Sequence, residues 1–104
     1  MVRKKFGELE GFIRKVKAEY SDSRIILFGS RAKGNHLMDS DYDIIIISRK
    51  FGNTGFAQRI ERVQSLWDGK NDLEPLCYTP EEFGEKASEI GIVKEALKSG
   101  VVLA

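Results

Sequence analysis

The chain has 104 residues, which fits one domain over 1–104 and leaves no room for a second domain with its own core. Lys and Arg number 17 against 16 Asp and Glu, so a formal net charge of +1 excludes a general attraction to nucleic acid or to an acidic membrane. With 41% hydrophobic and 32% charged residues, the composition is that of a folded, soluble globule.

The single cysteine, Cys77, excludes an internal disulfide and a thiolate metal cluster. The N-terminal segment carries charged residues at the positions where a signal peptide needs an apolar stretch. No apolar run approaches the roughly 20 residues of a membrane span. We therefore expect a cytoplasmic protein with no membrane partner.

The first half of the sequence predicts a helix and two strands. Apolar residues recur at steps of three and four over 5–20, which is typical of an amphipathic helix. The β-branched stretch 24–28, ended by Gly29, indicates a buried strand, and 30–33 indicates a short helical turn. Successive isoleucines in 41–48 indicate a strand covered on both faces and therefore central in its sheet.

A second helix is predicted over 56–68 and should cover the sheet beside the first. Phe56 and Trp67 lie on its apolar stripe, which favours core positions over a platform for base stacking. The stretch 73–78 predicts a third strand, and Pro75 places it at a sheet edge because proline cannot donate to a ladder.

The last third of the sequence predicts two helices and a short strand. Thr79 is a helix cap, with Pro80 at the first helical position and Glu82 three residues after the cap. Apolar residues over 92–97 mark the last helix, and 101–103 form a short closing strand. This order predicts an α+β fold, a small mixed β-sheet with helices packed mainly on one face.

Asp41 and Asp43 stand at the start of the isoleucine-rich strand. Because residues two apart on a strand point to the same face, the two carboxylates face one pocket, and Tyr42 between them points away from it toward the core. Like charges beside buried isoleucines repel each other unless a cation lies between them. Oxygen-only ligands suit Mg²⁺, which takes one or two carboxylates plus substrate phosphates. A solvated turn is the alternative for an isolated Asp-x-Asp.

Gly29 and Ser30 form a corner at the end of the preceding strand. Gly29 lets a phosphate approach the backbone without meeting a Cβ, and Ser30 begins a helical turn whose N–H groups favour an anion. Arg31 and Lys33 are equally compatible with a phosphate contact and with ordinary surface. Beside the paired carboxylates, this corner describes phosphoryl or nucleotidyl transfer.

The segments Gly29-Ser30-Arg31-Ala32-Lys33-Gly34 and Ser40-Asp41-Tyr42-Asp43-Ile44 resemble the signature of the DNA polymerase beta-like nucleotidyltransferase superfamily. The likeness is strong over 24–47 and weaker over 74–83, and the short length is similar to that of minimal nucleotidyltransferases. The resemblance implies that the Gly-Ser corner, with Arg31 beside it, holds the phosphates of an NTP. It also implies that three carboxylates hold two Mg²⁺ ions.

Asp41 and Asp43 would be the first two of these carboxylates, and the third should come from the next strand. Glu74 stands there, five residues before the Thr-Pro helix start, where related short sequences usually carry Asp. An unpaired carboxylate would be costly at that depth in a strand. Asp72 is the alternative third ligand, but it follows a turn composition in which Asp is common. We predict that Glu74 is the third catalytic and metal-binding residue.

The predicted function is transfer of NMP, with AMP from ATP as the favoured case, to an acceptor hydroxyl by a two-metal mechanism that releases pyrophosphate. The resemblance implies an antitoxin paired with a small helical HEPN-type partner protein, and a tyrosine of that partner is a candidate acceptor. The alternative is a non-catalytic interaction module that neutralises such a partner by binding. The weak net charge disfavours a nucleic-acid partner. The acceptor, the base preference and the oligomeric state, a homo-oligomer included, stay open.

Overall fold

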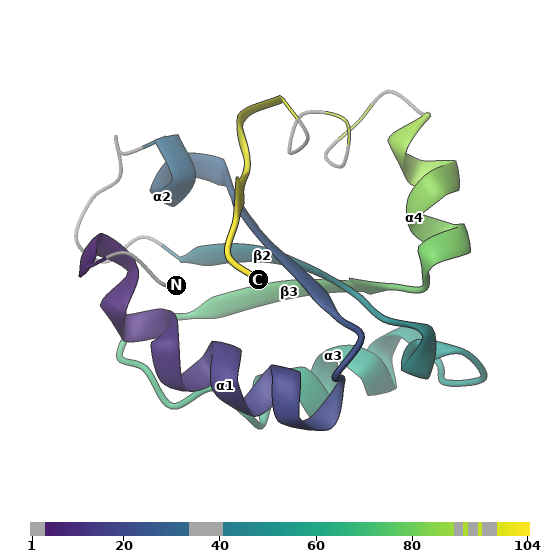
Figure 1. Cartoon of the computed structure of the whole chain (residues 1–104), viewed down its shortest axis with the longest axis horizontal. Coiled ribbons are helices and arrows are strands. Elements are labelled where there is room, and N and C mark those ends of the chain that lie inside the picture. The colour runs from purple at the N-terminus through teal and green to yellow at the C-terminus, as the bar shows by residue number, and fades with distance from the viewer. Residues whose placement is uncertain (1–3, 34–40, 89–90, 92–93, 95–97) are drawn as a thin grey trace.

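The computed structural model describes residues 4–33, 41–88, 91, 94 and 98–104. Its centre is a four-stranded sheet in the order β3-β2-β1-β4 (Figure 1). The strands are β1 (Arg24–Phe28), β2 (Tyr42–Ile47), β3 (Leu73–Tyr78) and β4 (Val101–Val102). β2 pairs parallel with β3, whereas β1 pairs antiparallel with both β2 and β4. The predicted mixed sheet and α+β fold class are confirmed.

The helical elements in the described residues are η1 (Lys4–Leu9), α1 (Glu10–Glu19), α2 (Gly29–Lys33), η2 (Arg49–Phe51), α3 (Phe56–Gln64) and α4 (Pro80–Ala87). Where one helix was predicted over 5–20, the chain first winds as a 3₁₀ turn that contains Gly7, a poor α-helix former. The second helix ends at Gln64, so the prediction that it reaches residue 68 is wrong. Most of the predicted last helix, 92–97, lies outside the described residues. No helix in the described part of the chain is long and apolar enough to cross a membrane.

The main core lies between one face of the sheet and the helices α1 and α3, which lie side by side below the sheet in Figure 1. β2 is internal in the sheet, as its isoleucines predict, and Ile44, Ile45 and Ile46 are fully buried. Cys77 packs in the same core, and burial raises the pKa of its thiol to about 12. Cys77 is thus a small buried apolar residue.

A smaller apolar cluster lies on the opposite face of the sheet. Strand residues meet Phe83 and Ala87 of α4 there. Trp67 packs against the main core as predicted. The prediction that Phe56 is a core residue is wrong. Phe56 is the first residue of α3 and is 44% exposed, and its ring contacts that of Tyr78 with 5.8 Å between centroids.

β3 is an edge strand, as Pro75 predicts, and α3 covers part of its outer edge. Gln64 donates a hydrogen bond to the Leu73 carbonyl at 3.2 Å, and Arg59 donates to the Cys77 carbonyl at 3.1 Å. Side chains therefore satisfy two carbonyls that another strand would otherwise seek, which protects this edge from pairing with a second chain.

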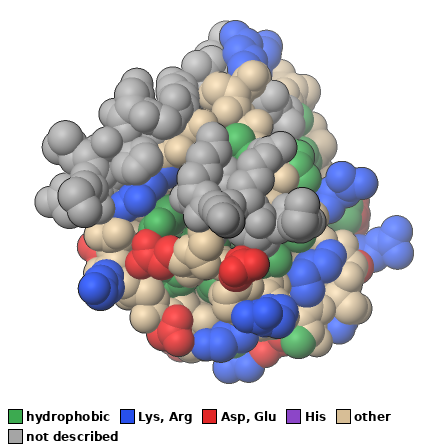
Figure 2. All heavy atoms as spheres, turned by 60° about the vertical axis from the view of Figure 1, so that its left-hand side comes forward, with side chains coloured by type: hydrophobic (Ala, Val, Ile, Leu, Met, Phe, Trp, Pro, Cys, Tyr) green, Lys and Arg blue, Asp and Glu red, His purple; other side chains and the backbone are tan. Residues whose placement is uncertain are grey.

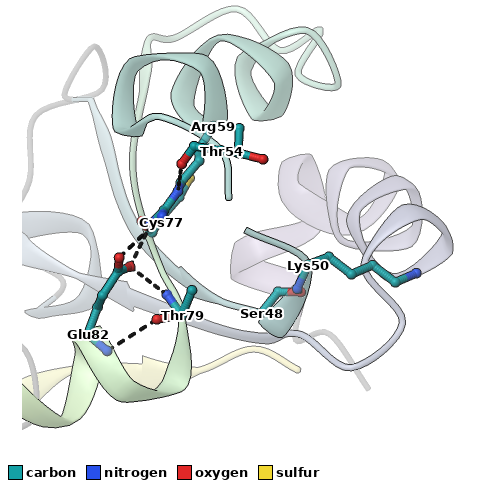
Figure 3. Close-up of polar contacts among 7 residues, drawn as sticks. All are labelled: Ser48, Lys50, Thr54, Arg59, Cys77, Thr79 and Glu82. Atoms are coloured by element: carbon teal, nitrogen blue, oxygen red, sulfur yellow. Dashed lines mark hydrogen bonds and ion pairs between the residues drawn. The ribbon is translucent and has the colours of Figure 1, made fainter. Parts of the chain in front are cut away.

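Arg59 joins α3, β3 and the start of α4 in one network (Figure 3). Its guanidinium is buried, donates to the Thr54 carbonyl at 2.8 Å and forms an ion pair with Glu82 at 2.6 Å. Glu82 completes the predicted capping box, since it accepts from the Thr79 N–H while the Thr79 hydroxyl accepts from the Glu82 N–H. The network fixes α4 against the sheet.

The ion pair predicts a pH-dependent stability. Hydrogen bonds from Arg59 and then from the Thr79 N–H lower the pKa of Glu82 from 4.5 to about 2. A lowered folded-state pKa stabilises the fold above pH 4.5, and this contribution is lost as the pH falls toward 2. Because the Glu82 side chain is 43% exposed, we expect Glu82→Gln to cost only about 1 kcal/mol at pH 7.

Thermal unfolding of both proteins between pH 7 and pH 2.5 measures this contribution. The difference between the wild type and Glu82→Gln should shrink toward zero at the acid end. Glu85→Gln, an exposed neighbour on α4, is the matched control and should unfold like the wild type throughout. A stability difference that stays constant with pH would contradict the role of the Arg59–Glu82 pair.

Candidate active site

Asp43 and Glu74 lie side by side on one face of the sheet, and Asp41 immediately precedes the same strand. Asp43 is the register partner of Glu74 across the parallel β2–β3 pair, so their side chains leave the sheet on the same face. Asp41 lies near both, because its charge acts on Asp43 and on Glu74. Figure 2, which turns this side of the molecule forward, shows several Asp and Glu side chains on it, among Lys and Arg side chains. The three predicted carboxylates are thus brought together.

The carboxyl groups perturb one another. Burial raises the pKa of Asp43, and the charge of Asp41 raises it further. Desolvation raises the pKa of Glu74, and the charges of Asp41 and Asp43 add to that effect. A hydrogen bond between Glu74 and Asp43 favours the proton on Glu74 and the negative charge on Asp43. Excess negative charge on a partly buried surface is the electrostatic signature of a site that accepts cations.

The donor set fits a hard divalent cation by its chemistry, because every member offers carboxylate oxygen. Among the described residues, no group of three or more His, Cys, Asp or Glu side chains already surrounds a common point as metal ligands do. Asp43 and Glu74 are register partners whose negative charges raise the pKa of Glu74, and a bound cation would neutralise that repulsion.

Gly29 has two structural reasons to be glycine. Its φ of +76° lies in the left-handed region, which L side chains rarely adopt. A Cβ built on it would also lie 2.4 Å from Oδ2 of Asp43. The Asp43 carboxylate therefore occupies the space beside the Gly29 backbone. The sequence predicted an open approach for a phosphate at this corner but gave no sign of this contact.

The other residues of the predicted phosphate corner belong to α2, which begins at Gly29. The side chain of Ser30 lies outside what the structure describes, and its role stays a prediction. Arg31 reaches back across the sheet, where its Nη1 donates to the hydroxyl of Tyr42 at 3.2 Å. His36, in the loop between the two motif segments, lies outside the described residues.

Asp72, the alternative third ligand, precedes β3, and its carbonyl accepts from the Tyr42 N–H at 2.8 Å. It contributes the last of the charges that raise the pKa of Glu74, after Asp41 and Asp43. Asp72 and Glu74 both line a hollow of about 320 Å³ at the start of β3, together with Lys70 and Trp67 among others. Asp72 therefore lies close to the acidic cluster of Asp41, Asp43 and Glu74.

Tyr42 makes a polar contact that the sequence pattern does not predict. Tyr42, between the two aspartates, was expected to be core, and it is 3% exposed. Its hydroxyl nevertheless donates to Oε2 of Glu8 at 2.6 Å, so it is a polar connection as well as a core residue. Nothing in the helical pattern around Glu8 signals this pair, because its partner is 34 positions away.

Comparison with known proteins places these features in a family. The model of the nucleotidyltransferase domain matches residues 9–102, which is most of the chain. No curated protein gives a match. A solved structure of a proposed nucleotidyltransferase from Sulfolobus solfataricus is 20% identical and superposes with a TM-score of 0.67, covering 95% of this chain and 78% of that one, which shows a shared fold. The chain belongs to the nucleotidyltransferase domain family.

Proposed function

We propose that the protein transfers AMP from ATP to an acceptor hydroxyl and releases pyrophosphate. The observation that carries this proposal is a row of register partners across three neighbouring strands, β1, β2 and β3. Phe28, which precedes the Gly29 corner, is the register partner of Asp43, and Asp43 is the register partner of Glu74. A triphosphate laid along this row would meet backbone N–H groups at one end and carboxylates at the other.

Asp41, Asp43 and Glu74 would hold two Mg²⁺ ions. Bound divalent ions stabilise the charge on the phosphates and lower the pKa of an attacking hydroxyl. Glu74 is favoured over Asp72 because it is the direct register partner of Asp43 and shares a hydrogen bond with it. The backbone at Gly29 and Ser30 would hold the β- and γ-phosphates, whereas the Arg31 guanidinium lies against Tyr42 on the opposite face of the sheet.

The direction of the row supports a proposal for the side from which the acceptor arrives. The attacking and leaving oxygens of phosphoryl transfer are roughly in line. If pyrophosphate leaves toward α2, the acceptor hydroxyl arrives from the side of β3, next to Glu74. The hollow of about 320 Å³ opens on that side. We propose that a hydroxyl of a partner protein enters there, with a tyrosine of a HEPN-type partner as the candidate.

One observation favours the alternative, a non-catalytic module that neutralises such a partner by binding. The carboxylates in the described residues do not already surround a common point. A module of this kind would need no bound metal and would not bind ATP more tightly in the presence of Mg²⁺. The two functions therefore differ in a binding measurement that requires no knowledge of the acceptor.

Calorimetric titration with ATP, in Mg²⁺ and then in EDTA, makes that distinction. We expect ATP to bind only with the metal present, because the carboxylate cluster otherwise repels the triphosphate. Glu74→Gln should weaken the metal-dependent binding more than Asp72→Asn, its matched neighbour. Equal affinity with and without Mg²⁺ would contradict the two-metal proposal, and a larger effect of Asp72→Asn would assign the third ligand to Asp72.

A further inference from the structure

The side chain of Tyr42 lies on the face of the sheet opposite the carboxylates, although Tyr42 stands between Asp41 and Asp43 in the sequence. Its hydroxyl makes two hydrogen bonds. It donates to Oε2 of Glu8 at 2.6 Å and accepts from Nη1 of Arg31 at 3.2 Å. The Arg31 guanidinium carbon also lies 4.2 Å from the centre of the Tyr42 ring, a cation–π contact.

These contacts join every segment that carries the candidate site. Arg31 belongs to α2, which begins at the Gly29 corner. The other carboxylate oxygen of Glu8, Oε1, accepts from the Lys70 N–H at 3.1 Å, in the loop that leads into β3 and Glu74. The edge of the Tyr42 ring contacts Trp67, with 5.5 Å between centroids, which supports the same loop. One buried side chain thus connects α2, β2 and the approach to β3.

The chemistry of this network suits a brace. The hydroxyl of Tyr42 lies between a carboxylate and a guanidinium, and hydrogen bonds to charged groups are short and strong. Members of a connected network also fix one another more firmly than separate pairs do. Because the Tyr42 side chain is buried, water cannot readily replace its partners. A short helix such as α2, with five residues, depends on such outside contacts for its position.

We infer that Tyr42 is a positioning residue for nucleotide binding, which holds α2 through Arg31 and holds the β3 approach through Glu8. This inference rests on the proposed function, because it assigns α2 to the triphosphate. It goes further in naming the side chain, remote from the carboxylate face, that sets the distance between the phosphate corner and the acidic cluster.

Tyr42→Phe tests the inference, because it keeps the ring and removes only the hydroxyl. The chain offers a closely matched control in Tyr20→Phe. Tyr20 is also buried and hydrogen-bonds a glutamate, Glu19, which pairs with Arg62. That Tyr–Glu–Arg group lies at the C-terminal end of α1, whereas Glu8 precedes the N-terminal end of the same helix. A merely structural loss should therefore be similar in both variants.

Two measurements separate positioning from stability. Titration with ATP in Mg²⁺ should give a dissociation constant raised about three- to tenfold by Tyr42→Phe and unchanged by Tyr20→Phe, the loss expected for one charge-assisted hydrogen bond. Amide hydrogen exchange without nucleotide should become several-fold faster at residues 29–33 in Tyr42→Phe alone. Glu8→Gln, which keeps a weaker acceptor for the same hydroxyl, should show a smaller change of the same kind.

The outcomes distinguish the two proposals. If the wild type fails to bind ATP with Mg²⁺, the proposed function is wrong, and the exchange measurement alone decides whether Tyr42 braces α2. If the wild type binds and Tyr42→Phe leaves either the affinity or the exchange at 29–33 unchanged, the inference is overturned. Equal effects of Tyr42→Phe and Tyr20→Phe would also overturn it. If Tyr42→Phe does not fold, Glu8→Gln carries the same test.

Discussion

Replacing Asp43 by Asn is expected to abolish nucleotidyl transfer and to leave the fold intact. Asn has the size of Asp, so the contact with Gly29 survives, and its amide oxygen can still accept the hydrogen bond from Glu74. One negative charge leaves a cluster that raises the pKa of Glu74, so the free energy of unfolding should be unchanged or higher. Losing several kcal/mol of charge stabilisation corresponds to a rate about a thousandfold lower.

Asp68→Asn is the control for this substitution. Asp68 is 86% exposed and pairs only with Lys15 at 3.5 Å among the ion pairs of the described residues, away from the cluster. It should transfer AMP and unfold like the wild type. The assignment of Asp43 is wrong if Asp43→Asn transfers AMP at the wild-type rate. An unfolded Asp43→Asn protein would show that the carboxylate serves the fold instead.

Substitutions of Gly29 are expected to damage both the fold and the site. Ala at this position meets a backbone φ of +76°, which costs about 1–2 kcal/mol for an L residue. Its Cβ would also approach Oδ2 of Asp43 to 2.4 Å, so that carboxylate must move. We expect Gly29→Ala to lower the free energy of unfolding by roughly 1–3 kcal/mol. Metal-dependent ATP binding should fall below detection, and Gly29→Val should be worse in both respects.

Gly11→Ala is the matched control, because Gly11 lies within α1 and an added Cβ there meets nothing within 4 Å. Since Ala is the better helix former, this variant should gain about 0.5–1 kcal/mol and bind ATP normally. Thermal unfolding and calorimetry on the two variants check both parts. Normal ATP affinity in a folded Gly29→Ala protein would show that neither the Gly29 corner nor its contact with Asp43 takes part in ATP binding.

Much of this fold could be predicted from short-range patterns. The isoleucines of β2 required cover on both faces, Pro75 required an edge, and Thr79 with Glu82 required a helix start, and each is found. Such predictions succeed because burial, proline geometry and capping act within a few residues. The ends of helices were predicted less accurately. α3 ends at Gln64, where the chain turns before the polar residues 68–72.

The missed features of the site all depend on contacts between distant segments. The Gly29 corner was predicted, but the carboxylate of Asp43 against it comes from strand pairing across β1 and β2. Tyr42 was predicted as core, and only the folded chain brings Glu8 to its hydroxyl. Glu74 was predicted as the third carboxylate, but its position beside Asp43 depends on the register of β2 with β3, which no local pattern specifies.

The proposed reaction transfers the AMP moiety of ATP, which contains the α-phosphorus, to the acceptor. Incubating the protein with Mg²⁺, an extract of the cells that carry it, and ATP labelled at either the α- or the γ-phosphorus tests this directly. We expect the α-label alone to enter an acceptor, in a reaction lost in EDTA and in Asp43→Asn. Transfer of the γ-label, or α-label transfer that Asp43→Asn leaves unchanged, would contradict the account. The absence of any transfer by the wild type would favour the non-catalytic module.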